Sequence, residues 1–389
     1  MITLIRDGEV FAPEPLGRKD VLLAGGVIAE VAEPGRIRIE GVAAEVVDAA
    51  GTKVLPGLID PHVHILGGGG EGGPATRAPE IRVEDIVSSG VTTVIGCLGT
   101  DGVTRHMTSL LAKARALEVE GVSAFIFSGS YEVPVRTLTG SVRSDLILVD
   151  KVIGAGEIAV SDHRSAQPTF DEIARLAAEC RVGGMLGGKA GVLHLHVGDG
   201  KRRLDLLFRL IRETEIPPSQ VIPTHMTRNP QLFEQGLEWV AAGGSIDVTV
   251  GPDPVPPDPE VRFEDAIARF KGMNLPFTRL LASSDSNGSM PVFDEAGRLV
   301  RLDIAKEKDL FRKFVDILRR ELLPVETAAR VFSTNAADFY KLGKKGRIEA
   351  GRDADLLVLG KDFELSDVFA RGKRMIAGGR LLARGTFSA

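Results

Sequence analysis

The stretch GLIDPHVHILGGGGEGGP, residues 57–74, places two histidines two positions apart at the end of an apolar run. In a β-strand, side chains at positions i and i+2 point to the same side, so the imidazoles of His62 and His64 can reach one metal ion. Two polar residues that bond to the backbone at a strand end are the simpler alternative. The four glycines that follow carry no side chain, and a main chain without side chains can lie against a bound molecule. The stretch therefore indicates a buried strand that ends in a metal centre, with a substrate loop beside it.

Seven further short apolar runs follow along the chain, and most of them precede a helical pattern. Uniformly apolar runs of this length are typical of strands buried on both faces of a parallel sheet. Intervening segments such as PTFDEIARLAAECRV have the periodicity of amphipathic helices. Eight strand–helix units predict an α/β fold, a TIM-like (β/α)8 barrel over residues 56–345. A doubly wound sheet remains an alternative, because periodicity cannot distinguish a closed barrel from an open parallel sheet. The eight runs are VLPGLIDPHVH, VTTVIGC, SAFIFSGS, EIAVSD, VLHLHVGD, VIPTHM, SIDVTVG and LLASSDS.

The two ends of the chain have a different pattern from the middle. Residues 1–55 and 346–389 both contain short runs of alternating apolar residues, interrupted by turns that contain glycine. This pattern is typical of half-buried antiparallel strands. We therefore expect a small β-sandwich domain that is assembled from both chain ends.

The composition excludes several classes of function. The net charge of −5 over 389 residues argues against a nucleic-acid or anionic-membrane surface, since both need a concentrated positive field. Two cysteines, Cys97 and Cys180, are too few for a disulfide framework, so we expect a reducing, cytoplasmic setting. The N-terminus resembles no signal peptide, and no apolar run has the length of about 18 residues that a membrane span requires.

Polar residues end six of the eight predicted strands. The carboxyl ends of the strands in such a barrel converge on one mouth, where catalytic groups gather. We therefore expect these side chains to meet, with His196 as the ligand from HLHVGD and His194 inside the structure. Asp285, in ASSDSNGS, could instead form an Asx turn or a helix cap, but beside imidazoles a carboxylate can bind metal and relay a proton, and we favour this role. The strand-end residues are His62, His64, Tyr131, Glu157, His194, His196, His225 and Asp285.

These residues carry a family resemblance. HVH on the first strand, separate histidines on the fifth and sixth, and an aspartate on the eighth resemble the amidohydrolase superfamily, as does GRIEAGRDADLLVL near the C-terminus. Six segments in order resemble, more narrowly, the isoaspartyl (β-aspartyl) dipeptidase family. They are DPHVHILGGGGEGGPATRAPE, GSYEVPVRTLTGS, AVSDHRSAQP, GGMLGGKAGVLHLHVGD, PTHMTRN and SSDSNGS.

The resemblance implies a binuclear metal centre, with two divalent ions bridged by a carboxylate and a hydroxide. It implies that His62, His64 and Asp285 hold one ion and that His196 and His225 hold the other. Zinc is favoured, because imidazole ligands and open positions suit hydrolytic zinc.

The chain departs from the family at the bridging position. The family's usual bridge is a carbamylated lysine on the fourth strand, and this sequence has Glu157 there. Glutamate supplies the same charge with roughly 3–4 Å less reach, by ordinary bond lengths. We expect a bulge at Gly154–Gly156 to bring Glu157 towards the metals. The alternative is a Glu157 that points to solvent, with the second ion absent or weakly bound.

The resemblance also assigns residues to a dipeptide substrate. It implies that Glu71 binds the free α-amino group and that Tyr131 donates a hydrogen bond to the carbonyl oxygen as charge develops there. An isoaspartyl dipeptide has two free carboxylates, which suit the guanidinium groups of Arg164 and Arg228 together with Ser289. We expect Thr100 and Asp101 to shape the rim of the pocket.

The predicted activity is that of a dipeptidase, a metalloprotease-type hydrolase of L-isoaspartyl dipeptides. The bridging hydroxide is the nucleophile, and Asp285 acts first as general base and then as general acid. A cyclic-amide hydrolase resembling dihydroorotase or hydantoinase, and an inactive metal-binding relative, are the alternatives. The resemblance further implies a homo-oligomer, such as an octamer. The sequence does not indicate which residue the enzyme prefers after isoaspartate.

Overall fold

The eight apolar runs form eight parallel strands in the computed structural model, which describes residues 2–251, 260–293 and 298–386. Six of these strands make one sheet in the order β11-β10-β9-β8-β7-β6, and β12 pairs with β13. The strands are β6 (Leu58–Val63), β7 (Val91–Gly96), β8 (Ser123–Ser128), β9 (Val152–Val160), β10 (Val192–Val197), β11 (Val221–Thr224), β12 (Ile246–Thr249) and β13 (Leu280–Ser283).

Hydrogen bonds join the two sheets on both sides and close the barrel. Met226 N, just past β11, donates to Asp247 O of β12 at 3.3 Å. On the other side, His64 N at the end of β6 donates to Ser286 O beyond β13 at 2.8 Å. The predicted barrel is thus confirmed, and the doubly wound sheet is excluded. Because the strands are covered on both faces, all nine residues of β9 are buried, as the uniformly apolar runs predict.

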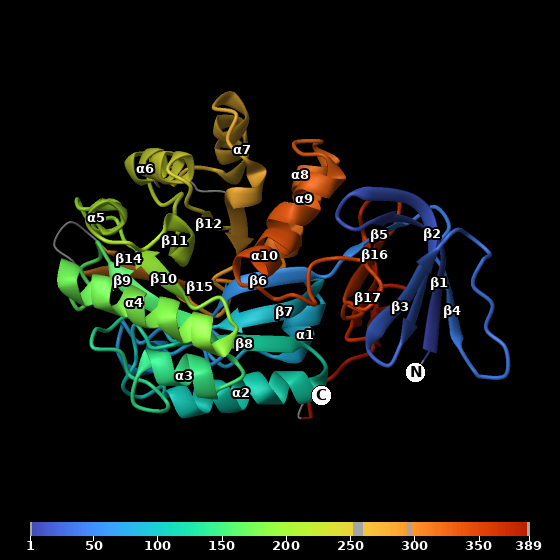
Figure 1. Cartoon of the computed structure of the whole chain (residues 1–389), viewed down its shortest axis with the longest axis horizontal. Coiled ribbons are helices and arrows are strands. Elements are labelled where there is room, and N and C mark those ends of the chain that lie inside the picture. The colour runs from blue at the N-terminus through green and yellow to red at the C-terminus, as the bar shows by residue number, and fades with distance from the viewer. Residues whose placement is uncertain (1, 252–259, 294–297, 387–389) are drawn as a thin grey trace.

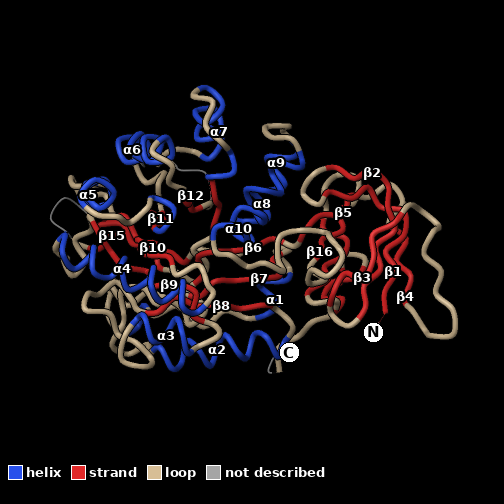
Figure 2. The backbone as a smooth tube through the Cα atoms, in the orientation of Figure 1, coloured by secondary structure: helices blue, strands red, loops and turns tan. Residues whose placement is uncertain are grey.

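Helices surround the barrel strands on the outside (Figure 2). Their ends follow sequence signals: α4 begins with a capping box between Thr169 and Glu172 and ends at Gly188, which is left-handed. The helices are α1 (Val83–Val87), α2 (Met107–Glu120), α3 (Val142–Leu148), α4 (Phe170–Gly187), α5 (Asp205–Glu213), α6 (Pro230–Ala241), α7 (Phe263–Gly272), α8 (Lys308–Arg319), α9 (Val325–Ala329) and α10 (Asn335–Phe339). Short 3-10 turns lie at Pro74–Thr76, Pro218–Gln220 and Phe277–Arg279, a π-helical turn at Arg330–Thr334, and a hairpin of β14 (Ser289–Phe293) and β15 (Leu299–Ile304) follows β13.

Strands from both chain ends form a second sheet beside the barrel, seen as blue and red arrows in Figure 1. The sheet runs β19-β18-β17-β16-β5-β1-β2-β3, and β4 pairs with β1. Antiparallel pairing of β16 with β5 joins the C-terminal to the N-terminal strands. The strands are β1 (Ile2–Phe11), β2 (Pro15–Ala24), β3 (Val27–Ala32), β4 (Glu45–Asp48), β5 (Lys53–Pro56), β16 (Leu356–Leu359), β17 (Leu365–Ala370), β18 (Lys373–Ala377) and β19 (Arg380–Leu381).

The nine strands form one continuous sheet that curls over its own core. The edge strand β3 returns to the segment before β16, where Ile28 N donates to Arg352 O at 2.8 Å. Buried side chains such as Val10, Val21 and Phe369 fill the space between. The first apolar run, VLPGLIDPHVH, is divided at Gly57: residues up to Pro56 belong to this sheet, and the barrel begins at Leu58.

Candidate metal centre

Glu157 lies on β9 within a local bulge. Between Ala155 and Ile158, β9 has one residue more than the facing stretch of β10, where Leu193 and Leu195 are the partners. A Cβ at Gly156 would lie 2.8 Å from the Cβ of His194, so a side chain there would prevent this close packing of β9 on β10. The expected bulge is therefore present, and it brings a short glutamate side chain to the barrel mouth.

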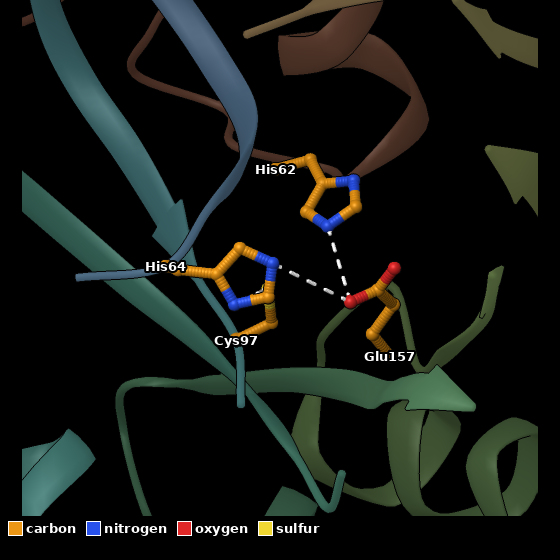
Figure 3. A group of neighbouring side chains, drawn as sticks. All are labelled: His62, His64, Cys97 and Glu157. Carbon is orange, nitrogen blue, oxygen red and sulfur yellow. Dashed lines mark hydrogen bonds and ion pairs between the residues drawn. The ribbon is translucent and has the colours of Figure 1, made fainter. Parts of the chain in front are cut away.

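The two carboxylate oxygens of Glu157 face two different pairs of imidazoles. Oε2 lies 3.3 Å from His62 Nε2 and 3.6 Å from His64 Nε2, as the dashed lines in Figure 3 mark. Oε1 lies 2.7 Å from His196 Nδ1 and 3.2 Å from His225 Nε2. The carboxylate thus stands between two groups of nitrogen donors, which is the arrangement of a bridging ligand.

Asp285 joins the first of these groups. Its Oδ1 lies 3.0 Å from His64 Nε2 and 3.6 Å from His62 Nε2. We call His62, His64 and Asp285 the HxH half-site, and His196 and His225 the β10–β11 half-site. Glu157 is common to both.

The donors fit divalent ions on two grounds. Among the described residues, His62 Nε2, Glu157 Oε2 and Asp285 Oδ1 are buried and have no hydrogen-bond partner. Buried polar atoms are normally paired, so an orphaned set that converges on one point indicates a missing ligand. Imidazole nitrogen and carboxylate oxygen are the donors that zinc takes in hydrolytic sites. In the described parts of the chain, ligand atoms close enough to share an ion occur in two groups, His62–His64–Cys97–Glu157 and Glu157–His196–His225.

The electrostatics of the site also favour a cation. Burial alone would raise the pKa of Glu157, but His62 and His196 outweigh it and hold that pKa well below the usual value. Burial alone would lower the pKa of His62, but the charge of Glu157 outweighs it and raises that pKa well above the usual value. The carboxylate therefore stays ionised and attracts positive charge, which a divalent ion supplies more fully than a proton.

Each imidazole uses its second nitrogen for a supporting contact. In the HxH half-site, His62 Nδ1 lies 3.3 Å from Thr224 Oγ1 and His64 Nδ1 lies 3.8 Å from Cys97 Sγ. In the β10–β11 half-site, His196 Nε2 lies 2.9 Å from Asp162 Oδ2 and His225 Nδ1 lies 2.7 Å from Thr249 Oγ1.

These four supporting residues are absent from the predicted site. Thr224 and Thr249 are the last residues of β11 and β12, so the rule that polar strand ends face the mouth could have found them. Asp162 stands in SDHR beside the predicted Arg164, where it reads as an ordinary turn aspartate. Burial would raise the pKa of Asp162, but its bonds with His196 and Arg164 outweigh it and hold that pKa below the usual value.

A second cluster centres on Glu71 and reaches the metal donors through Arg164, whose Nη2 lies 3.3 Å from His196 Nε2. Glu71 Oε1 accepts hydrogen bonds from Thr100 Oγ1 at 2.9 Å and Ser289 Oγ at 2.8 Å, and it lies 3.4 Å from Arg164 Nη1. Its other oxygen, Oε2, is buried without a hydrogen-bond partner in the described parts of the chain. An anionic oxygen left free in this way is suited to a positively charged ligand group.

The glycine run packs tightly against the rest of the mouth. Gly67 is left-handed at φ 75°, and a Cβ on it would clash with the backbone oxygen of Ala78. Ala78 N donates to Gly68 O at 2.9 Å, and Gly68 N donates to Asn287 O at 2.7 Å. The run therefore lets the chain between His64 and Glu71 pass close to the loop after β13.

The other predicted residues divide between the mouth and its surroundings. The Tyr131 hydroxyl lies 2.8 Å from His196 Nδ1, and burial raises its pKa well above the usual value, so it stays a proton donor. Arg228 is half-buried beside His225, and its Nε has no hydrogen-bond partner among the described residues. Asp101 pairs with Arg77 at the rim, 2.7 Å away.

His194 belongs to neither group of possible metal ligands among the described residues, although its ring centroid lies 4.9 Å from that of His62. Its Nδ1 lies 3.2 Å from the hydroxyl of Tyr340 inside the barrel. This placement agrees with the choice of His196 over His194 as the residue that faces Glu157.

Comparisons with known proteins show the family to which this chain belongs. The amidohydrolase family model matches residues 232–375. The crystal structure of the β-aspartyl dipeptidase of Fervidobacterium islandicum AW-1, in complex with a β-Asp-Leu dipeptide, is 46% identical and has a TM-score of 0.92, covering 98% of this chain and 97% of that one. The chain belongs to the β-aspartyl dipeptidase family of the amidohydrolase superfamily. The family predicted from the sequence is thereby confirmed.

The chain is also similar to more distant proteins. The adenine deaminase of Halalkalibacterium halodurans is 26% identical over 97% of this chain, which spans only 58% of that enzyme's length. The dihydropyrimidinase of Brevibacillus agri NCHU1002 is 17% identical with a TM-score of 0.67, over 99% of this chain and 97% of its own, and shows the fold alone.

Within the described residues, none of the helices has the length and apolarity needed to cross a membrane.

Proposed function

We propose that this protein is a metal-dependent dipeptidase that hydrolyses the β-aspartyl peptide bond of L-isoaspartyl dipeptides. The observation that carries the proposal is the position of Glu157, whose two oxygens each face one pair of imidazoles. The β-Asp-Leu dipeptide bound to the Fervidobacterium relative supports the substrate class.

Two divalent ions, most suitably zinc, would occupy the two half-sites. His62, His64 and Asp285 would hold one ion, His196 and His225 the other, and Glu157 would bridge them. The pair would lower the pKa of a shared water towards neutrality and polarise the scissile carbonyl.

Asp285 and Tyr131 would handle the proton and the developing charge. Burial would raise the pKa of Asp285, but His62 and His64 outweigh it and lower the pKa to about 2. Asp285 therefore starts as a carboxylate, which can accept a proton from the attacking water and pass it to the leaving amine. The Tyr131 hydroxyl keeps its proton and can donate a hydrogen bond to the carbonyl oxygen.

The residues of the Glu71 cluster, together with Arg228, would select the substrate. The free Oε2 of Glu71 suits the α-ammonium group of a dipeptide, with Thr100 and Ser289 holding Oε1. Arg164 and Arg228 would bind the two carboxylates of an isoaspartyl dipeptide. We also propose a homo-oligomer, such as an octamer, as the family resemblance implies, in the cytoplasmic setting that the low cysteine content favours.

The decisive experiment compares three substrates with the zinc-loaded protein: iso-Asp-Leu, the α-linked Asp-Leu and dihydroorotate. We expect hydrolysis of iso-Asp-Leu alone, loss of this activity after chelation, and recovery when zinc is restored. Hydrolysis of dihydroorotate instead would establish the cyclic-amide alternative. A protein that binds two zinc ions but cleaves none of the three would be an inactive relative.

A further inference from the structure

Asp162 contacts both the metal donors and the predicted substrate arginine. It lies two residues after β9, and its side chain is only 3% exposed. Its Oδ2 lies 2.9 Å from His196 Nε2 and accepts a hydrogen bond from Arg164 Nη2 at 2.8 Å. Its Oδ1 accepts from the backbone N of Arg164 at 2.7 Å and from Arg164 Nε at 3.1 Å.

The contact with His196 determines which ring nitrogen can bind an ion. An ion in the β10–β11 half-site would bind the lone pair of Nδ1, since this nitrogen faces Glu157, 2.7 Å from Oε1. The ring hydrogen then lies on Nε2, where Asp162 can accept it. Carboxylates that hold a ligating histidine in this way orient the ring and strengthen its binding to the metal.

The contact with Arg164 determines how the guanidinium faces the mouth. Asp162 holds the Nε and Nη2 edge, which leaves Nη1 directed towards Glu71 Oε1 at 3.4 Å. The guanidinium also lies over the Tyr131 ring, 5.5 Å from its centroid. An arginine held along one edge presents its remaining donors in a defined direction.

We propose that Asp162 is a positioning residue that couples ion binding at the β10–β11 half-site to substrate binding by Arg164. The inference deepens the proposed function and depends on it for the role of Arg164. One buried carboxylate orients both groups, so its removal weakens the binding of zinc and of substrate together. A residue that served the fold alone would affect neither once the protein is folded.

The test uses Asp162→Asn, which keeps the size of the side chain. An amide has one acceptor oxygen, so it cannot replace both carboxylate oxygens: its NH2 group would face either Arg164 N and Nε or His196 Nε2 and Arg164 Nη2. We expect the affinity for one of two zinc ions, measured by competition with a chromogenic chelator, to fall about 10- to 100-fold. We also expect the KM for iso-Asp-Leu to rise by at least about tenfold, in line with the loss of a charged hydrogen bond.

Arg164→Met separates the two effects. It removes a guanidinium whose Nη2 lies 3.3 Å from His196 Nε2, but the 2.9 Å contact of His196 with Asp162 stays. We therefore expect KM to rise and zinc affinity to stay unchanged. In the double variant the KM should match that of Arg164→Met alone, since Asp162 then has no guanidinium to position. Unchanged zinc affinity in Asp162→Asn, or KM effects that simply add in the double variant, would overturn the proposal.

Asp367→Asn is the matched control. Asp367 is also buried and also holds an arginine, with Oδ1 2.8 Å from Arg374 Nε, but it lies in the terminal sheet on β17. We expect it to lower the melting temperature of the metal-free protein without changing zinc affinity or KM. If the wild-type protein does not hydrolyse iso-Asp-Leu, the proposed function is refuted. The zinc measurement needs no turnover, so it still tests whether Asp162 supports zinc binding.

Discussion

The HxH half-site and the β10–β11 half-site face opposite oxygens of one carboxylate, yet their imidazoles are held differently. His196 and His225 have short supporting contacts of 2.9 and 2.7 Å. The corresponding contacts of His62 and His64 are 3.3 and 3.8 Å, and the latter is to a thiol. The orphaned atoms His62 Nε2 and Asp285 Oδ1 both belong to the HxH half-site.

This difference separates a site that is oriented in advance from one that an ion must complete. Hydrogen bonds already hold the rings of the β10–β11 half-site in place, so little order is left for an ion to impose. In the HxH half-site the ion itself supplies the partner that the buried atoms lack. We therefore expect the first zinc ion to enter the β10–β11 half-site and the second to enter the HxH half-site.

Glu157→Gln tests whether the two half-sites depend on one carboxylate, and it should have the largest effect. The amide is neutral and offers one acceptor oxygen, so it can serve only one side. We expect the zinc content to fall to one ion or fewer per chain, measured by elemental analysis. We expect kcat/KM to fall by about 10,000-fold or more, because the charge stabilisation supplied by metal ions is worth several kcal/mol. Two retained zinc ions with full activity would contradict the bridging role.

The carboxylate bridge also makes a prediction about carbon dioxide. A glutamate needs no carbamylation, so the metal-free protein should regain full activity with zinc in buffer depleted of carbon dioxide and bicarbonate. A requirement for bicarbonate would mean that Glu157 does not form the bridge.

Asp285→Asn separates chemistry from ion binding in the HxH half-site. The amide keeps an oxygen for the ion but cannot accept a proton, so we expect turnover to fall between about 100- and 10,000-fold. Zinc content should stay largely unchanged, as measured on the same preparation. If full turnover survives, Asp285 is not the proton carrier, whatever its distance from His64.

The pH dependence of zinc binding should also differ between the half-sites. Burial lowers the pKa of His225 to about 3, so this imidazole is neutral at physiological pH. In the HxH half-site, burial alone would lower the pKa values of His62 and His64. Glu157 outweighs burial at His62 and raises its pKa well above 6.5. Cys97 and Asp285 do the same for the pKa of His64. Zinc binds neutral imidazole, so the second ion must expel protons from His62 and His64.

Because two protons are displaced, we expect the zinc affinity for the second ion to rise by up to about 100-fold per pH unit. The zinc affinity for the first ion should depend less on pH. Zinc titration calorimetry between about pH 6 and 8, in buffers of different ionisation enthalpy, measures the protons released. In the metal-free protein, protonated His62 and His64 stabilise the fold below the unfolded-state pKa of about 6.5, and this contribution is lost as pH rises through the folded-state pKa values. Equal proton release from both binding steps would remove this distinction.

The sequence predicts more of this site at the strand ends than between them. The histidines could be placed because parallel strands buried on both faces leave an uninterrupted apolar run, and their carboxyl ends must meet at one mouth. Glu157 could be placed because the family resemblance puts it at the bridging position, and Gly154 and Gly156 permit the bulge that its short side chain needs. The same rule could have found Thr224 and Thr249 but not the contacts that they make, because the nitrogen that an imidazole turns towards a neighbour depends on ring orientation in the packed structure. Asp162 therefore reads as a turn residue, and Cys97 as part of an apolar strand end.

The smallest expected effect comes from the supporting contacts themselves, in the matched pair Thr249→Val and Cys97→Ala. Thr249→Val removes the 2.7 Å contact with His225 while keeping the shape of the side chain, and zinc affinity should fall about tenfold. Cys97→Ala removes only a 3.8 Å thiol contact with His64, a weak one, so the loss should stay within about threefold. Chelator competition measures both, and thermal unfolding of the metal-free variants controls for damage to the fold. An equal loss would mean that Cys97 holds His64 as firmly as Thr249 holds His225, and the two half-sites would then be prepared for metal to the same degree.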